Sequence, residues 1–96
     1  MKNISIALDI LVPAAYNQMV GIDTRLKRLD RAVAENENQI RELTQKAHEY
    51  TAKYDYQGLV KAIKKAEKLQ HHNSTLIKTI ERTENKLSAI AKRVAN

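Results

Sequence analysis

Apolar side chains recur along this chain in alternating steps of three and four residues, in two series that mirror each other. Such heptad spacing places all members of a series on one face of an α-helix. The first series consists of Ala15, Met19, Ile22, Leu26, Leu29, Val33, Asn36, Ile40, Leu43, Ala47 and Tyr50. The second consists of Leu59, Ala62, Ala66, Leu69, Asn73, Leu76, Ile80, Thr83, Leu87, Ile90 and Val94. The pattern predicts two long helices, each with one narrow apolar seam.

The two series also predict how the helices pair. When the chain reverses direction at its middle, they meet layer by layer, beginning with Tyr50 opposite Leu59. In every layer an a position faces a d position, which an antiparallel pair of supercoiled helices requires. The expected fold is all-α, a long two-helix coiled-coil hairpin with arms over residues 13–53 and 56–96 and a tip over 54–58.

An apolar segment over residues 1–12 precedes the first arm. Its apolar residues alternate as in a strand, but Ile4, Leu8 and Leu11 also share one helical face. Since the rest of the chain offers no partner strand, we expect a short helix that ends at Pro13, which bends or restarts the chain. This segment is a candidate docking or dimerisation element, or it folds back on the hairpin as a third helix.

The same segment raises two membrane-related alternatives. A basic start, an apolar run and small residues after it resemble a signal peptide, but Asp9 inside the run and Pro13 at its end weigh against one. The run is also shorter than the roughly 18 apolar residues that a membrane-spanning helix needs. Peripheral insertion of this segment into a membrane stays open as a weaker alternative.

Two amides interrupt the apolar seam at one level. Asn36 and Asn73 fall in the same layer of the expected pairing. Two buried amides can hydrogen-bond each other, whereas an amide opposite Leu leaves a polar group unsatisfied, at about 1–3 kcal/mol. A shift of one arm by a heptad separates the two residues, so we interpret the pair as a device that sets the register.

Charge divides the two edges of the hairpin. One edge carries only bases and neutral residues, and we call its six strongest cations the basic edge: Arg25, Lys46, Lys53, Lys65, Lys86 and Arg93. The other, which we call the acidic edge, carries no base: Asp23, Asp30, Glu37, Ile63, Gln70, Ile77, Glu84 and Ala91. Like edges face each other in an antiparallel pair, so the basic edge sets cations beside cations. A chain that forms only a lone hairpin is not expected to favour such contacts.

Two surfaces therefore become candidates for binding. Ile63, Ile77 and Ala91 widen the apolar face of the second helix, as in helices that pack on more than one neighbour, and together with Ile4, Leu8 and Leu11 they form the candidate assembly surface. Two hairpins could then build a four-helix or larger bundle. The basic edge could instead follow the phosphates of a nucleic acid, or it could simply be a solvated lysine-rich face.

Composition narrows the classes of function. The 96 residues hold no Cys, Phe or Trp, and the net charge of +6 comes almost wholly from the second arm. A lack of Cys removes disulfides and thiolate chemistry and fits a cytoplasmic protein. No seam position carries a charged or imidazole side chain, so we expect no catalytic site, no metal, no cofactor and no small-molecule substrate.

We therefore expect a non-catalytic protein–protein interaction module that acts as a homo-oligomer or on a protein partner. A small chain with a thin core usually needs such association for stability. The alternative is a sequence-tolerant nucleic-acid-binding protein that uses the basic edge. Association with a membrane is the least expected of the three.

Overall fold

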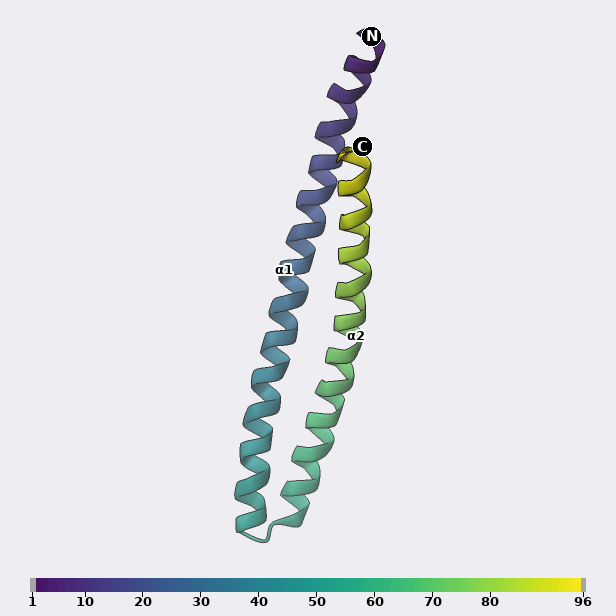
Figure 1. Ribbon diagram of the computed structural model, residues 1–96. Helices are drawn as coiled ribbons and strands as arrows, with labels where there is room; N and C mark the ends of the chain where they lie inside the picture. The colour runs from purple at the N-terminus through teal and green to yellow at the C-terminus, as the bar shows by residue number, and fades with distance from the viewer. Residues whose placement is uncertain (1, 96) are drawn as a thin grey trace.

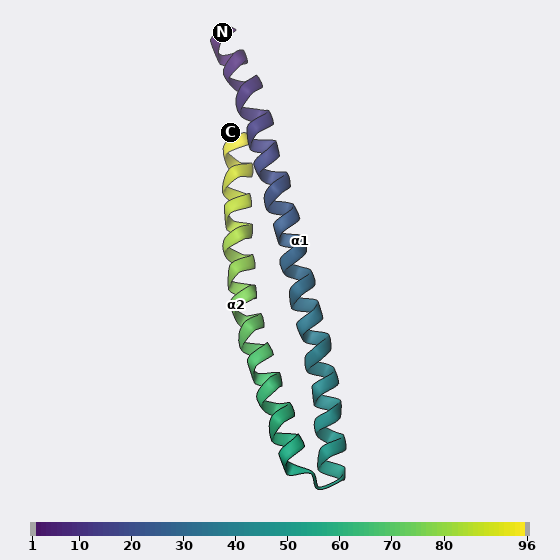
Figure 2. The same ribbon diagram turned by 180° about the vertical axis from the view of Figure 1, so that it is seen from behind.

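Two helices account for nearly all of the protein. The computed structural model describes residues 2–95, and the side chains of residues 14–95. Helix α1 spans Lys2–Ala52 and helix α2 spans Tyr56–Ala95. They lie side by side and antiparallel in a rod that measures 78 × 15 × 14 Å (Figures 1 and 2). The predicted all-α hairpin is confirmed.

Helix α1 is the longer of the two and is continuous through Pro13. Residues 2–12 therefore extend the first arm, where we expected a separate short helix. Proline removes a single N–H from the helical hydrogen-bond ladder, so the turns on either side keep their own bonds, although the change costs about 3 kcal/mol. The start of α1 reaches beyond the last turn of α2 (Figure 1). The side chains of Ile4, Leu8 and Leu11 lie outside the described part.

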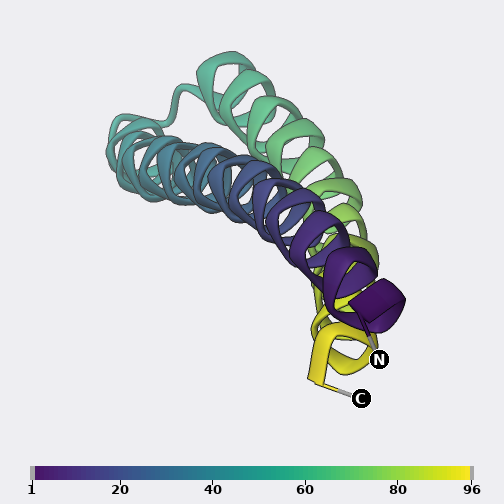
Figure 3. The same cartoon turned by 90° about the horizontal axis from the view of Figure 1, so that it is seen from above.

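Burial along both helices follows the two heptad series. Every member of the two series is buried or half-buried, apart from Val94 near the end of α2. Viewed from above, the two helices wind partly around each other, which keeps the seam closed along the rod (Figure 3). Among the described side chains only Ala62, Asn73 and Thr83 are buried, and no large side chain is completely shielded from solvent. The hairpin alone thus has a thin core.

A tight turn over residues 53–55 joins the helices. Tyr54 adopts a left-handed backbone conformation with φ of 57°. The N–H of Asp55 donates to the carbonyl of Tyr50 at 2.8 Å, and the N–H of Tyr54 donates to the carbonyl of Thr51 at 3.1 Å. These two bonds form a Schellman motif, which satisfies the last carbonyls of α1.

Asp55 also begins α2. Its Oδ1 accepts a hydrogen bond from the N–H of Gly58 at 3.0 Å, three residues into the new helix. This is the geometry of an N-cap, the role expected for an aspartate at this position. Because one residue closes both helix ends, the reversal needs only three residues.

Candidate functional site

The two seam asparagines meet in one layer. The Nδ2 of Asn36 donates to the Oδ1 of Asn73 at 2.8 Å, and the Nδ2 of Asn73 donates to the carbonyl of Val33 at 3.4 Å. Asn73 is 7% exposed, so its amide is removed from water. No buried side-chain polar atom in the described part lacks a partner. The pair is satisfied only in this pairing of the helices, which supports its interpretation as a register device.

Thr83 is the other polar residue of the seam. Its hydroxyl donates to the carbonyl of Thr79 at 2.7 Å, one turn earlier in the same helix. This bond within α2 allows a hydroxyl to lie in an apolar layer. The hydroxyl proton of Thr83 is therefore used within its own helix, and its oxygen is left only as an acceptor.

Along the basic edge the cations gather in two groups. The open-end group, at the end away from the turn, consists of Arg25, Lys86 and Arg93; the tip group consists of Lys46, Lys53 and Lys65. Two layers without a formal charge separate the groups, one of Ala32 with Thr79 and one of Gln39 with His72. The two groups follow from the register that the sequence predicted, in which Arg25 lies beside Lys86 and Lys46 beside Lys65.

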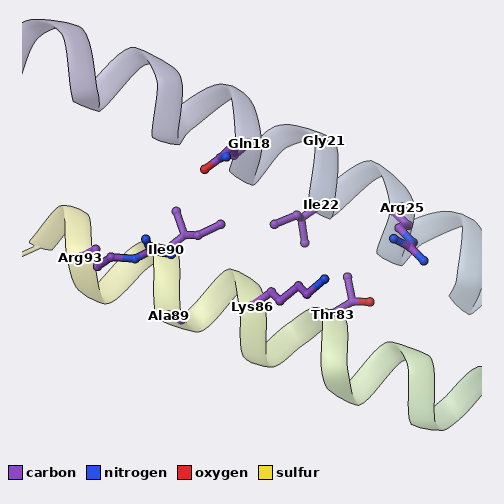
Figure 4. A pocket seen from close by; sticks show the side chains of 9 residues that line it. All are labelled: Gln18, Gly21, Ile22, Arg25, Thr83, Lys86, Ala89, Ile90 and Arg93. Carbon is purple, nitrogen blue, oxygen red and sulfur yellow. The ribbon is translucent and has the colours of Figure 1, made fainter.

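The open-end group surrounds a groove of about 640 Å³ between the helices. Its floor is formed by apolar and small residues, and three cations and one amide stand around it (Figure 4). In the close-up the side chain of Lys86 extends from α2 toward α1. The lining residues are Gln18, Gly21, Ile22, Arg25, Thr83, Lys86, Ala89, Ile90 and Arg93, with no acid among them.

None of the cations around this groove is neutralised by a carboxylate. In the part of the chain whose side chains are described, one ion pair occurs, between Lys27 and Asp23 at 3.1 Å. Both of its members are exposed, so it contributes less than about 1 kcal/mol. The positive charge of Arg25, Lys86 and Arg93 is left to attract an external anion.

Gly21 has a distinct place at this groove. A Cβ added to Gly21 would meet no atom within 4 Å, so packing inside the hairpin does not require a glycine there. Glycine within a helix costs about 1 kcal/mol relative to alanine. Packing within the hairpin therefore does not explain the glycine at this position.

Exposed apolar residues gather on the opposite side of the rod. Ile63 and Ile77 are each 44% exposed, whereas Ala91 is half-buried. Both isoleucines occupy e positions of the heptad, on the acidic edge. The large exposed hydrophobic residues at e and adjacent b positions form what we call the apolar face: Tyr16, Val20, Tyr56, Val60, Ile63 and Ile77.

Sequence reasoning identified only the two isoleucines of this face. Tyr16 and Tyr56 share the e position with them, and Val20 and Val60 follow one turn later at b positions. The signal was present in the same seven-residue spacing, which Tyr56, Ile63 and Ile77 share within α2 alone; the structure adds the exposed fraction of each side chain. Tyr16 and Val20 lie toward the open end, and Tyr56, Val60 and Ile63 lie toward the tip.

A second groove of about 480 Å³ opens on this side near the middle of the rod. Ile77 stands at one side of it, and Asn73 and Ile40 of the seam lie at its base. Its remaining lining residues are Glu37, Arg41, Gln70 and Ser74. At this groove Ile40 of the seam is half-buried and Asn73 is buried, so a monomer leaves only the side of the seam at Ile40 partly open to water.

The tip carries two further exposed aromatic residues. Tyr54 is 78% exposed and Tyr56 is also largely exposed, whereas Tyr50 is half-buried. A Cβ built on Gly58 would lie 2.6 Å from Cδ1 of Tyr50, so this ring packs directly over Gly58. Only Tyr50, therefore, closes the end of the seam.

Two features are absent from the described part of the chain. No group of three or more His, Cys, Asp or Glu side chains there is arranged to hold a metal ion. None of the helices described is both long and apolar enough to cross a bilayer.

Comparisons of this chain with protein-family models, with curated proteins and with solved structures found no match.

Proposed function

We propose that this protein is a non-catalytic assembly module in which two copies of the hairpin pair through their apolar faces. The observation that carries the proposal is the position of the large exposed hydrophobic residues. Six of the eight in the described part lie on one side of the rod, the side away from the basic edge. Scattered surface hydrophobic residues are ordinary, but a one-sided set along a helix pair is typical of an interface.

The thin core supports the same conclusion. Within the described part no large side chain is fully buried, and the seam residues Ile40 and Asn73 line an open groove. A second hairpin on this side would remove both the seam and the apolar face from water. Burial of apolar area at about 25 cal/mol per Å² then supplies stability that a single hairpin lacks.

Charge favours an antiparallel arrangement of the two copies. If both tips lay at the same end, Asp23 and Glu84 of each copy would place four carboxylates in one layer. With the tips at opposite ends, the layer of Asp23 and Glu84 meets Thr44 and Ile63 of the second copy, and no layer holds more than two carboxylates. Like charges at close range are unfavourable, so a two-fold axis across the rod is preferred.

This antiparallel pairing also brings the apolar ends together. The open-end layer that contains Tyr16 meets the tip layer that contains Tyr56 of the second copy. The two-fold axis passes between the layers of Ile77 and Gln70, both of which line the 480 Å³ groove. Ile77 of one copy therefore faces Gln70 and the groove of the other, as a knob that packs into a hole.

Sedimentation equilibrium of the full chain at micromolar concentration tests the proposal. We expect a dimer whose helicity falls when it is diluted below its dissociation constant. The double substitution Ile63→Gln, Ile77→Gln removes four isoleucines per dimer at about 1 kcal/mol each, which weakens dimerisation about a thousandfold. The matched control is Lys64→Gln, Lys78→Gln, at neighbouring f positions on the outer side of α2, and it should remain dimeric.

A stable helical monomer at micromolar concentration would overturn the proposal. So would a dimer that survives the isoleucine substitutions without loss of affinity. Deletion of residues 1–12 distinguishes the two candidate assembly elements, because the apolar face predicts that the shortened chain still dimerises.

A further inference from the structure

We infer that the basic edge binds double-stranded nucleic acid, with the rod lying along the duplex and its two cation groups touching phosphates about one helical turn apart. This inference goes beyond the proposed assembly function, and it uses the opposite side of the rod. The two surfaces do not compete, since a dimer formed through the apolar faces displays one basic edge on each outer side.

The cations of the basic edge lie beside one another in the hairpin and repel one another. In the paired register Arg25 lies beside Lys86 and Lys46 beside Lys65, and no acid falls on the edge. Each like-charge contact is unfavourable by a few tenths of a kcal/mol. An external polyanion reverses the sign of this contribution by giving the cations an anionic partner, although Lys46 and Lys53 also have Glu42 and Glu49 one turn earlier on α1.

The spacing of the two cation groups matches the repeat of a nucleic-acid duplex. Lys65 and Lys86 lie 21 residues apart on α2, which corresponds to about 31 Å at 1.5 Å per residue. Between the full groups, from Lys53 and Lys65 to Lys86 and Arg93, the separation is somewhat larger. One turn of B-form DNA measures about 34–36 Å. A rod that lies along one side of a duplex can therefore meet the phosphate backbone at its two cation groups and face a groove at its neutral layers.

The groove of the open-end group is surrounded by hydrogen-bond donors. Its lining combines Arg25, Lys86 and Arg93 with the amide of Gln18, so charged and neutral donors surround the same concave surface (Figure 4). Gly21 has no side chain to project into the groove, and no atom of the hairpin lies within 4 Å of the place where a Cβ would be. A ridge of phosphates can approach the helix backbone here more closely than it could with any larger residue.

The same edge indicates sequence-tolerant binding. The six cations are suited to phosphate contacts, which fix position on a duplex without reading its bases. Of the exposed aromatic residues that could stack on unpaired bases, Tyr16 and Tyr56 lie on the apolar face, and Tyr54, next to Lys53 at the turn, is the one near this edge. Double-stranded nucleic acid is therefore favoured over a single strand.

Fluorescence-anisotropy titrations with the full chain test this inference, with a labelled 24-base-pair DNA duplex of arbitrary sequence as the probe. With six phosphate contacts, the affinity should fall about a thousandfold between 50 and 200 mM salt. The substitutions Lys46→Gln, Lys65→Gln and Lys86→Gln remove three contacts, so the fall should shrink to about fortyfold. The matched control, Lys64→Gln, Lys78→Gln and Lys92→Gln, loses the same charge from f positions and should keep the steep salt dependence.

A second series tests the spacing. An 8-base-pair duplex reaches only one cation group at a time, whereas a 24-base-pair duplex spans both. We expect tight binding to appear only with the longer duplex, and we expect this length dependence to disappear when Lys46, Lys53 and Lys65 are replaced by Gln. A 24-nucleotide single strand and vesicles with 30% anionic lipid serve as competing polyanions of other kinds.

Several results would overturn the inference. One is no binding to the duplex at 50 mM salt, and another is an equal effect of the basic-edge and control substitutions. A third is an affinity for the single strand or the vesicles equal to the affinity for the duplex. Failure of this inference is distinguishable from failure of the assembly proposal. The basic-edge variant should still sediment as a dimer, and Ile63→Gln, Ile77→Gln should change the oligomeric state and not the salt dependence per hairpin.

Discussion

Asn36 and Asn73 join the two helices by a side-chain hydrogen bond of 2.8 Å, 37 residues apart in the chain and near the middle of the rod. The bond lies in the layer where both heptad series break their apolar rule. It is the one side-chain to side-chain hydrogen bond between the helices in the described part, so polar specificity across the seam is concentrated at this level.

A double-mutant cycle on this pair should show strong coupling. Asn73→Leu or Asn36→Leu alone leaves a seam amide without its partner, which costs about 1–3 kcal/mol and offsets the gain from burying Leu. Replacing both by Leu removes the polar groups together and should give a protein at least as stable as the original. Urea unfolding of the four proteins is expected to give a coupling free energy of about 1 kcal/mol or more. Additive effects would show that the hydrogen bond contributes nothing to pairing.

The double leucine variant should lose accuracy of register as it gains stability. Without the two amides, a shift of one helix by a heptad no longer leaves a buried amide without its hydrogen-bond partner. Spin labels on the outer faces of α1 and α2, in a sample diluted with unlabelled chain, should report a single distance within the hairpin of the original protein and a broader distribution in the variant. An unchanged distribution would mean that the turn alone fixes the register.

Tyr54→Gly should stabilise the hairpin by about 1 kcal/mol. The residue holds a φ of 57°, where side chains other than glycine are strained, and its own side chain is 78% exposed. Chemical denaturation measures the change, with Tyr56→Gly as a control that lies in a helical conformation and should destabilise. A loss of stability in Tyr54→Gly would indicate that the ring makes a contact that outweighs the strain.

Gly58→Ala should act in the opposite direction. Its Cβ would lie 2.6 Å from the ring of Tyr50 and 2.9 Å from Oδ2 of Asp55, so the ring and the capping carboxylate must both move. We expect a loss of about 1–3 kcal/mol despite the higher helix propensity of alanine. Gly58→Ala combined with Tyr50→Leu should recover part of this loss. If the single variant were as stable as the original, the packing of Tyr50 over Gly58 would be wrong.

Gly21→Ala, by contrast, should raise stability by about 1 kcal/mol. No atom lies within 4 Å of the added methyl group, so the gain in helix propensity is not opposed by packing. The thermal midpoint of the full chain measures this effect. A destabilised Gly21→Ala variant would show that the residue packs against part of the assembly, and the groove would then be an interface between copies.

How far the sequence predicted this structure depends on the feature. The seam residues and the start of α2 followed from local rules, because heptad spacing acts over a few residues. Continuity at Pro13 did not follow, since the penalty for proline is finite and a long helix can absorb it. The strained conformation of Tyr54 also gave no signal, as the Schellman motif usually takes glycine or asparagine at that position.

The candidate surfaces show the same division. The two edges could be assigned from heptad positions, and both isoleucines of the apolar face were recognised. The separation of the basic edge into two groups, and the alignment of Tyr16 and Tyr56 with those isoleucines, follow from the same predicted register and could have been read from the sequence. The exposure of each side chain and the grooves between the helices depend on the folded pair.

The orientation of two paired hairpins tests the central claim most directly. The chain has no cysteine, so Gln57→Cys introduces a single labelling site at the tip, on the outer side of α2. An antiparallel pair separates the two tips by about 35 residues of helix, or roughly 50 Å, and pulsed electron paramagnetic resonance should report one distance near that value. A tip-to-tip distance below about 25 Å, or no intermolecular distance at concentrations where the chain is folded, would contradict the antiparallel apolar-face dimer.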